Sequence, residues 1–468
     1  MTSVERGLAA ATLVAAATAS FGQENSLNRP GSGARAAGMG NAFIAVSDDG
    51  TAASWNPAGL SQLRKPELSL VHTTSRRNLF LEGYRARDQS AAYTTLRTPS
   101  TTGDIEFASA AVPFSVAGRP ITLQGSWRRL YQLSARTRGN IRRIPASEDA
   151  RPESLIQLDN TTDGNVDLWS VAGAIRLTSR LSVGWSTDFY RGGWEDRGNA
   201  SDDPGVLGPT DFSSFRNSNR IGGHNLTLGL LLAYPSVRVG VVYHGSLRSD
   251  YEVSQSSRSS LAAPFDLRSG PEDRVALLFP RSLGWGVAWL PKPLLRLALD
   301  FTYDEWTKFL VEGTPASPDR PVSGFDGLLP ELSPTRNTLT VNAGLEKLFP
   351  VKGSYVPLRL GVSHEPQGGR DPLLRDDSVH MIVAAGTGLN SNRVKLDVAV
   401  EHRWGSFRNA RNFSPVYLVG RAQELGLPLP PEAFGVTRLQ EWRLKVSVIY
   451  RITNTEKLKD LVKKVFGS

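Results

Sequence analysis

Apolar and polar residues alternate along most of the chain, and this period restricts the possible folds more than any other feature. Between Ser282 and Trp306, one face carries large apolar side chains and the other carries small, polar and charged ones. A two-residue period is typical of strands with one apolar face, because successive side chains point to opposite sides of a sheet. Further predicted hairpins with this pattern lie at Val166–Arg191, Asn225–Asp250, Leu339–Glu365 and Met381–Trp404.

The connections between the strands predict how the sheet closes. Single strands at Glu67–Ser75, Asp104–Pro113, Pro120–Gln132 and Trp442–Ile452 bring the predicted total to about 14. Tight turns alternate with long predicted loops, which include Arg76–Gly103, Ser134–Asn165, Gly192–Ile221 and Gly405–Gln440. The six predicted tight turns are Ser115–Gly118, Thr178–Arg180, Pro235-Ser236, Pro291–Pro293, Pro350–Ser354 and Asn390–Asn392. An even strand count with short turns on one rim and long loops on the other is typical of an outer-membrane up-and-down antiparallel β-barrel. The expected fold class is therefore all-β, a transmembrane barrel.

The charged faces of these strands are expected to look into the barrel. Near the bilayer midplane, lipid-facing charges such as Arg296, Asp300 or Lys395 would each cost up to about 2–4 kcal/mol. The apolar faces therefore point outward, and the charged faces line a lumen in which ion pairs hold the wall together.

Composition excludes several other classes. No apolar run reaches the roughly 18–20 residues of a membrane-spanning helix. The 468 residues include no cysteine, which removes disulfides, thiolate metal sites and cysteine nucleophiles. Lys and Arg outnumber Asp and Glu by 54 to 45, a net charge of +9, but the cations are scattered and form no stripe that would indicate a nucleic-acid partner. The excess indicates at most a mild attraction to anionic surfaces.

The first residues resemble a secretory signal peptide. Arg6 precedes an apolar stretch, Leu8–Ala19, and Ala17-Thr18-Ala19 supplies a cleavage pattern of small residues. We expect cleavage near Ala19 and a location in the outer membrane. The predicted organisation is a signal peptide at 1–19, a plug at 20–66, a barrel at 67–452 and a tail at 453–468.

The segment before the first strand does not read as barrel wall. Asn28–Leu63 is dense in Gly, Ala and small polar residues, which let backbone pack closely against other backbone. Gly31-x-Gly33 lacks the strand, third glycine and βαβ unit of a dinucleotide site. We expect a plug, or hatch, inside the lumen, and a periplasmic extension is the alternative.

Several motifs resemble one family. Gly33–Phe43 (GARAAGMGNAF), Asp48-Asp49 and Trp55–Leu60 (WNPAGL) are similar to the N-terminal hatch of FadL-type outer-membrane transporters, and the same signature occurs in the related PorV and PorQ proteins. Pro280–Trp306 resembles a strand pair of that family. The resemblance implies a monomeric, hatch-plugged channel for hydrophobic compounds such as long-chain fatty acids or aromatic hydrocarbons, which are released by hatch movement or through a lateral gap in the wall. It assigns hatch or gating roles to Gly33, Gly38, Gly40, Asn56, Pro57 and Ala58.

Two apolar loop segments are candidate ligand contacts on their own pattern. Exposed apolar clusters can mark binding sites, and cover for the barrel mouth is the other interpretation. The candidate residues are Val275, Leu277, Phe279, Phe325, Leu328 and Leu329.

We expect no enzyme, no cofactor and no metal. The six histidines are dispersed without metal-ligand spacing, and no nucleophile elbow is present. The residues after Ile452 have the spacing of an amphipathic helix with a basic face, which predicts a short periplasmic tail. Two alternatives stay open: a PorV-like scaffold with a secretion-system or periplasmic partner, and a soluble secreted β-protein.

Overall fold

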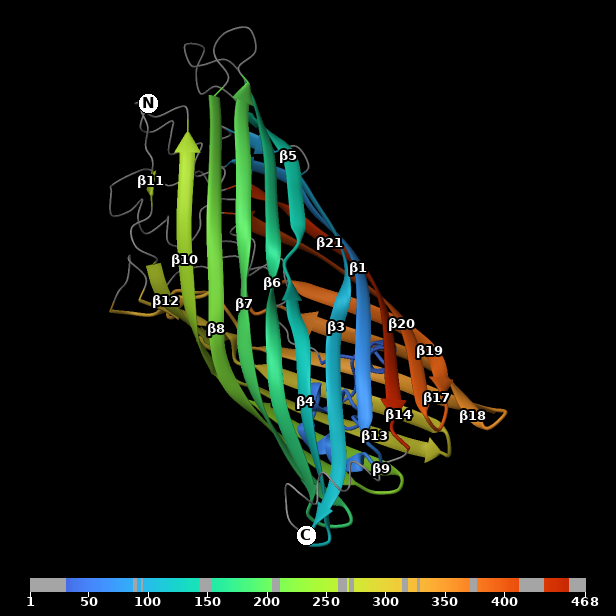
Figure 1. Ribbon diagram of the computed structural model, residues 1–468. Coiled ribbons are helices and arrows are strands. Elements are labelled where there is room, and N and C mark those ends of the chain that lie inside the picture. Colours follow the sequence, from blue (N-terminus) through green and yellow to red (C-terminus); the bar gives the residue numbers. More distant parts are fainter. Residues whose placement is uncertain are drawn as a thin grey trace.

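The computed structural model of the chain is a closed, antiparallel β-barrel of 14 wall strands (Figure 1). It describes residues 31–86, 91–93, 96–143, 154–203, 211–259, 267–268, 273–313, 319–325, 329–370, 377–411 and 433–453. The predicted signal peptide, nearly all of the predicted tail and Leu328 lie outside the described residues.

The wall strands follow one another around the barrel in chain order. They are β1 (Glu67–Ala86), β3 (Leu96–Val116), β4 (Arg119–Gln132), β6 (Ser154–Arg176), β7 (Leu181–Asp203), β8 (Asp211–Ala233), β9 (Val237–His244), β13 (Ser282–Lys292), β14 (Leu295–Asp304), β17 (Thr338–Val351), β18 (Ser354–Pro366), β19 (Val379–Asn390), β20 (Val394–Arg411) and β21 (Ala433–Arg451). Four further strands prolong this wall beyond short breaks: β5 (Ala135–Arg143), β10 (Leu247–Ser259), β12 (Asp273–Phe279) and β15 (Leu310–Glu312). Short pieces at β2 (Ala91–Tyr93), β11 (Leu267–Arg268) and β16 (Val322–Ser323) pair with them.

The barrel closes where its first and last strands meet. β1 pairs with β21 from Glu67↔Arg451 to Ala86↔Ala433. Each strand in this ladder is about twice as long as the roughly 9–11 residues that cross a bilayer. The sheet therefore has no free edge at this seam.

All six predicted tight turns are confirmed, and they share one rim, which we call the turn rim. Ala117-Gly118 and Lys352-Gly353 both have positive φ at their two central positions, as a two-residue hairpin requires. The opposite rim carries the longer connections, and we call it the loop rim.

The facing of the strands is also confirmed. On β8, Leu226, Leu228 and Leu230 are 46–49% exposed on the outer surface, whereas the intervening Thr227 is 1% exposed. Arg359, Lys395 and Asp397 are buried on the lumen side. Such an apolar outer band suits lipid and argues against the soluble β-protein.

The predicted loops were too long. β6, β7 and β8 each have 23 residues and rise above the shorter strands on the other side of the barrel (Figure 1). Much of the predicted loops Ser134–Asn165 and Gly192–Ile221 is therefore strand. Beyond the bilayer both faces of a strand meet water, so the apolar alternation disappears although the hydrogen-bonded ladder continues.

Residues 31–66, which we call the luminal segment, lie inside the barrel (Figure 1). They contain α3 (Ala34–Gly38), η1 (Ala52–Ser54) and η2 (Pro57–Gln62). α3 contacts β18 to β21, and η2 contacts β4, β6, β7 and β8 on the other side. The segment thus crosses the lumen. Its Phe43 and Trp55 rings meet edge-on at 5.8 Å and pack with Ala36, Met39, Ala288 and Ala298 in a small core.

Candidate functional site

The luminal segment lies with its backbone directly against glycines of the wall. Gly40 has φ +61°, and a Cβ there would lie 2.4 Å from the backbone nitrogen of Val362. From the wall side, a Cβ at Gly361 would lie 1.9 Å from the nitrogen of Gly40. Gly38 and Gly386 approach each other in the same way. Of the three glycines that the family resemblance assigns to a hatch, Gly33 (φ +115°) instead contacts Thr51 within the segment. Small residues on both sides therefore set how deeply the segment fits.

Asn56 joins the segment to the opposite part of the wall. Its Nδ2 donates to the carbonyl of Leu230 on β8 at 2.9 Å and to that of Ile44 at 3.2 Å. Its Oδ1 accepts from the amide of Ala58 at 3.1 Å and so caps η2. Pro57 begins this helix and packs with Asn56 and Ala58 against Gly184 and Gly229. The structure thus brings Asn56, Pro57 and Ala58 together at the wall.

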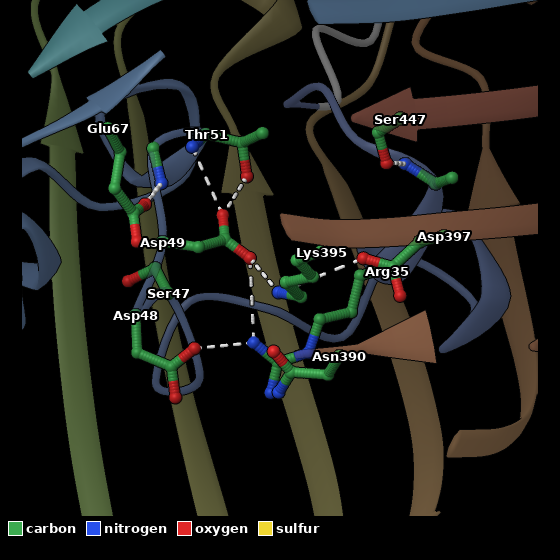
Figure 2. A network of polar contacts seen from close by, with 12 residues as sticks. Arg35, Ser47, Asp48, Asp49, Thr51, Glu67, Asn390, Lys395, Asp397 and Ser447 are labelled. Carbon is green, nitrogen blue, oxygen red and sulfur yellow. Dashed lines mark hydrogen bonds and ion pairs between the residues drawn. The ribbon is translucent and has the colours of Figure 1, made fainter. Parts of the chain in front are cut away.

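A buried ion network fixes the other side of the segment (Figure 2). Arg35 donates twice to Glu346 of β17, at 2.8 Å each, and also pairs with Asp48 of its own segment. Asp49 accepts from Lys395 of β20 at 2.5 Å. Sequence reasoning had recognised Asp48-Asp49 only as part of a motif. Their partners in the wall could not be inferred, because these come from strands 190 to 346 residues away.

The network extends into the wall. Arg296 and Arg238 each approach Asp48 at 3.4 Å. Arg359 bridges Glu346 and Asp397, at 2.8 Å from each carboxylate. Asp300 accepts from the amides of Phe43 and Ile44.

The two segment aspartates are held in their charged form. Burial alone would raise their pKa values, but the surrounding cations outweigh it. Arg35, Arg296 and Arg238 hold the pKa of Asp48 well below its usual range. Lys395 and Arg35 lower the pKa of Asp49 to about 2. The network therefore keeps these charges across the whole physiological pH range.

The wall is interrupted between β3 and the β4–β5 line, and we call this interruption the wall gap. The β3–β4 ladder runs from Val116↔Arg119 to Phe107↔Arg128, and the next pair is Arg97↔Arg138. Residues 98–106 and 129–137, all of them described, form no backbone pairs with each other. The ladders on either side of the wall gap, β1–β3 and β4–β6, each have a register shift at the level where the gap begins. These shifts lie at Val71/His72 and at Arg129/Tyr131.

Side chains bridge the wall gap where the backbone does not. Arg129 pairs with Asp104 across it, and Ser100 donates to the carbonyl of Ser134. Farther up, the hydroxyls of Thr98 and Thr137 are 2.7 Å apart. Asp104 is 43% exposed, so the ion pair is partly hydrated.

Two cavities lead from the luminal segment to the wall gap. The first, the segment cavity, has a volume of about 100 Å³ and lies against Ile44 and Trp55 of the segment. The second, the gap cavity, has about 190 Å³ and reaches Asp104, Ile105 and Leu130 at the gap. Arg128 lines both. The cavities are therefore neighbours on one path.

An apolar cluster follows the same path. Leu168 and Tyr190, which line the segment cavity, pack with Leu247. Leu130 of the gap cavity and Phe279 from the loop rim pack against this cluster. Apolar surface thus connects the loop rim with the wall gap.

The candidate loop residues take two positions. Val275, Leu277 and Phe279 lie on β12, and Phe325 follows β16. Phe309 joins the two groups, with ring centroids 5.0 Å from Phe279 and 5.1 Å from Phe325. Leu329 is half-buried farther along. Trp306 completes this aromatic cluster; neither it nor Phe309 stood out in the sequence, since Trp306 read as the end of a strand.

No group of three or more His, Asp or Glu side chains in the described ranges is arranged to hold a metal ion. None of the helices described here is long and apolar enough to span a bilayer.

Comparison with known proteins places the fold. No family model matches the chain, and no curated protein does. Among solved structures, a Pseudomonas aeruginosa FadL homologue has a TM-score of 0.60 at 15% identity, over 91% of this chain and 100% of that chain. The Pseudomonas putida toluene transporter TodX has 0.56 at 12%, over 91% and 100%. The Ralstonia pickettii toluene transporter TbuX has 0.50 at 13%, over 91% and 99%. The chain therefore has the fold of the FadL-type outer-membrane transporters.

Proposed function

We propose that the protein is an outer-membrane channel that takes up hydrophobic compounds and releases them sideways through the wall gap. The observation that carries the proposal is the interrupted ladder between β3 and the β4–β5 line, next to a cavity and an apolar path. Similar folds in the TodX and TbuX toluene transporters support uptake of hydrophobic molecules in general. The luminal segment acts as a plug that blocks the straight route.

Energetics favour the sideways route over displacement of the luminal segment. Removing one partner from a buried ion pair costs about 3–5 kcal/mol, and moving the segment would separate Arg35 from Glu346 and Asp49 from Lys395 together. Widening the wall gap breaks one partly exposed ion pair, about 0–1 kcal/mol, and hydrogen bonds of about 0.5–1.5 kcal/mol each. The gap is therefore the cheaper opening.

The gap cavity favours an amphiphile with an anionic head group, such as a long-chain fatty acid, over a plain hydrocarbon. A hydrocarbon would strip water from charged side chains without replacing their contacts. A carboxylate can pair with the excess cations while its chain follows Leu130 and Ile105. The lining has five cations against three acids, an excess of two: Arg77, Arg128, Arg129, Arg443 and Lys445 against Asp104, Glu106 and Glu441.

We assign the first contact with the ligand to the loop rim. Val275, Leu277 and Phe279 are half-buried, and Phe279 packs against the apolar cluster that leads inward. Phe325 belongs to the aromatic cluster through Phe309, and Leu329 is half-buried farther along the chain. A Leu277→Asp variant is expected to weaken capture at low ligand concentration and to leave the rate at saturation nearly unchanged.

A disulfide across the wall gap tests the release route. The chain has no cysteine, so Thr98→Cys with Thr137→Cys introduces a single pair at positions whose hydroxyls are 2.7 Å apart. In cells lacking their own fatty-acid channel, uptake of radiolabelled oleate should fall when this pair is oxidised and return on reduction. Toluene uptake, measured in parallel, should be lower than oleate uptake throughout.

The matched control places the same bond in an intact ladder. Thr302→Cys with Thr340→Cys joins direct partners on β14 and β17 that also line the segment cavity. Oxidising this pair should leave uptake unchanged. Equal uptake by the locked and reduced gap variants would reject lateral release. A secretion scaffold, the alternative function, would give no oleate uptake in any variant.

A further inference from the structure

The turn rim carries exposed cations around most of its circumference. They stand just before β1 and at five of the six tight turns. Each is exposed, and none forms an ion pair with a carboxylate among the described residues. The six residues are Arg64, Arg119, Arg180, Lys292, Lys352 and Arg393.

No exposed acid balances this charge. Neither Asp nor Glu occurs within the six turns, all of which the structure describes. Glu67, at the start of β1, is 5% exposed and pairs with Arg451 at 3.0 Å. Among the described residues, the exposed charge of this rim is therefore positive.

The loop rim has a different arrangement. Several of its exposed arginines pair with neighbouring acids: Arg136 with Asp159, Arg281 with Glu305 and Arg320 with Glu331. Exposed basic residues thus occur on both rims, but acids lie among those of the loop rim, whereas the six turns contain none. General surface solubility does not produce such a difference between two ends of one barrel.

The cations of the turn rim lie beside apolar residues of the outer surface. Val116, Leu177 and Val351 are 38–47% exposed within three residues of Arg119, Arg180 and Lys352. Arg180 lies over the ring of Tyr234, 4.8 Å from its centroid, at the one turn that has no cation of its own. Apolar and basic groups at one level match the boundary between acyl chains and head groups.

We propose that the turn rim is a binding ring for anionic phospholipid head groups in the leaflet that surrounds it. The cations are spread around the barrel as a leaflet is, whereas a protein partner would cover one sector. Each cation has free donors for a phosphate oxygen, and the neighbouring apolar residue contacts the acyl chain. The ring would fix the height and tilt of the barrel in the membrane.

Lipid retention by the purified full-length protein tests the ring. Protein extracted from bilayers of phosphatidylethanolamine with phosphatidylglycerol should retain phosphatidylglycerol above its share in the bilayer, as measured by native mass spectrometry. The triple variant Arg119→Gln, Arg180→Gln and Arg393→Gln should lose retention by roughly fivefold per cation, which corresponds to about 1 kcal/mol each. The control triple variant Arg136→Gln, Arg281→Gln and Arg320→Gln, at the loop rim, should retain the lipid like the parent.

Two results would overturn the proposal: no enrichment of phosphatidylglycerol on the parent, or equal enrichment on the turn-rim variant. Heat-modifiable gel migration confirms that each variant is a folded barrel. The inference rests on the proposed membrane location and not on the ligand, so it can fail while oleate uptake succeeds, and the reverse.

Discussion

At the residue scale, a few polar side chains join the luminal segment to the wall. Glycines, which lack a side chain, let the two backbones approach each other. Asn56 alone satisfies a carbonyl on β8, a carbonyl of Ile44 and the first turn of η2, and it is fully buried. Gly361 contributes by lacking a side chain where Gly40 lies. Both features lead to single-residue predictions.

Asn56→Ala is expected to loosen the luminal segment without unfolding the barrel. The change leaves the buried carbonyl of Leu230 without its donor and costs about 1–3 kcal/mol. Hydrogen–deuterium exchange should accelerate in residues 41–62, while the strands stay protected. Asn392→Ala, an exposed turn residue, serves as the control. Unchanged exchange in the segment would contradict the assignment of Asn56.

Gly361→Ala is expected to displace the segment much more than its size suggests. The new Cβ would meet the backbone of Gly40 at 1.9 Å, and backbone cannot move aside as a flexible side chain can. Gly125→Ala is the matched control, because a Cβ there meets nothing within 4 Å. Limited proteolysis should cut the luminal segment in Gly361→Ala and spare it in Gly125→Ala. Equal resistance of the two variants would show that the segment does not pack closely against Gly361.

At the scale of elements, the sequence predicts the wall strands well where they cross lipid and poorly elsewhere. Alternation such as Leu283, Trp285, Val287 and Trp289 reports the contact with lipid on one face. It disappears in the upper parts of β6 to β8, which are held by ladder hydrogen bonds that any residue except proline can make. Strand number was therefore predictable and strand length was not.

The wall gap could not be predicted for a related reason. Residues 98–106 include Pro99 and Gly103, which are uncommon inside strands, but the sequence does not show that the pairing lost is the one with residues 129–137. Pairing is a property of two segments, whereas periodicity describes one. The same holds for the ion network, where Asp48 and Asp49 were visible and Arg238, Arg296 and Lys395 were not recognisable as their partners.

The bridge across the wall gap gives a prediction for this element. Asp104→Asn removes the ion pair with Arg129 but keeps a side chain of the same shape. Stability should change by less than about 1 kcal/mol, because the pair is partly exposed. Oleate uptake should become faster. Arg320→Gln, which breaks an exposed pair away from the gap, should leave the rate unchanged; slower uptake by Asp104→Asn would contradict a gating role.

At the scale of the whole molecule, the ion network predicts how the barrel and its luminal segment respond to acid. The pKa of Asp49 in the folded protein is lowered to about 2, below the value of about 4 expected in an unfolded chain. A carboxyl group whose pKa is lower in the folded than in the unfolded chain stabilises the folded state at pH values above its unfolded pKa. This contribution is lost as the pH falls from about 4 through about 2. The stabilising contribution of Asp49 should therefore be constant between pH 5 and pH 8.

Tryptophan fluorescence measured against pH checks this prediction. The measurement uses a variant in which Trp55 is the only tryptophan, so that the signal reports on the luminal segment. The signal should change as the pH falls from about 4 to about 2. In Asp49→Asn this transition at low pH should be smaller, because one of the titrating groups is gone. A low-pH transition of the same size in both proteins would show that Asp49 does not help to hold the segment.

The position of the luminal segment also constrains how the barrel is made. The segment precedes the first strand, yet it contacts Glu67 at the start of β1, Lys395 on β20 and Ser447 on β21. The seam between β1 and β21 joins the two ends of the wall, and the segment contacts strands on both sides of it. The luminal segment therefore reaches its full set of contacts only when the last strand is in place.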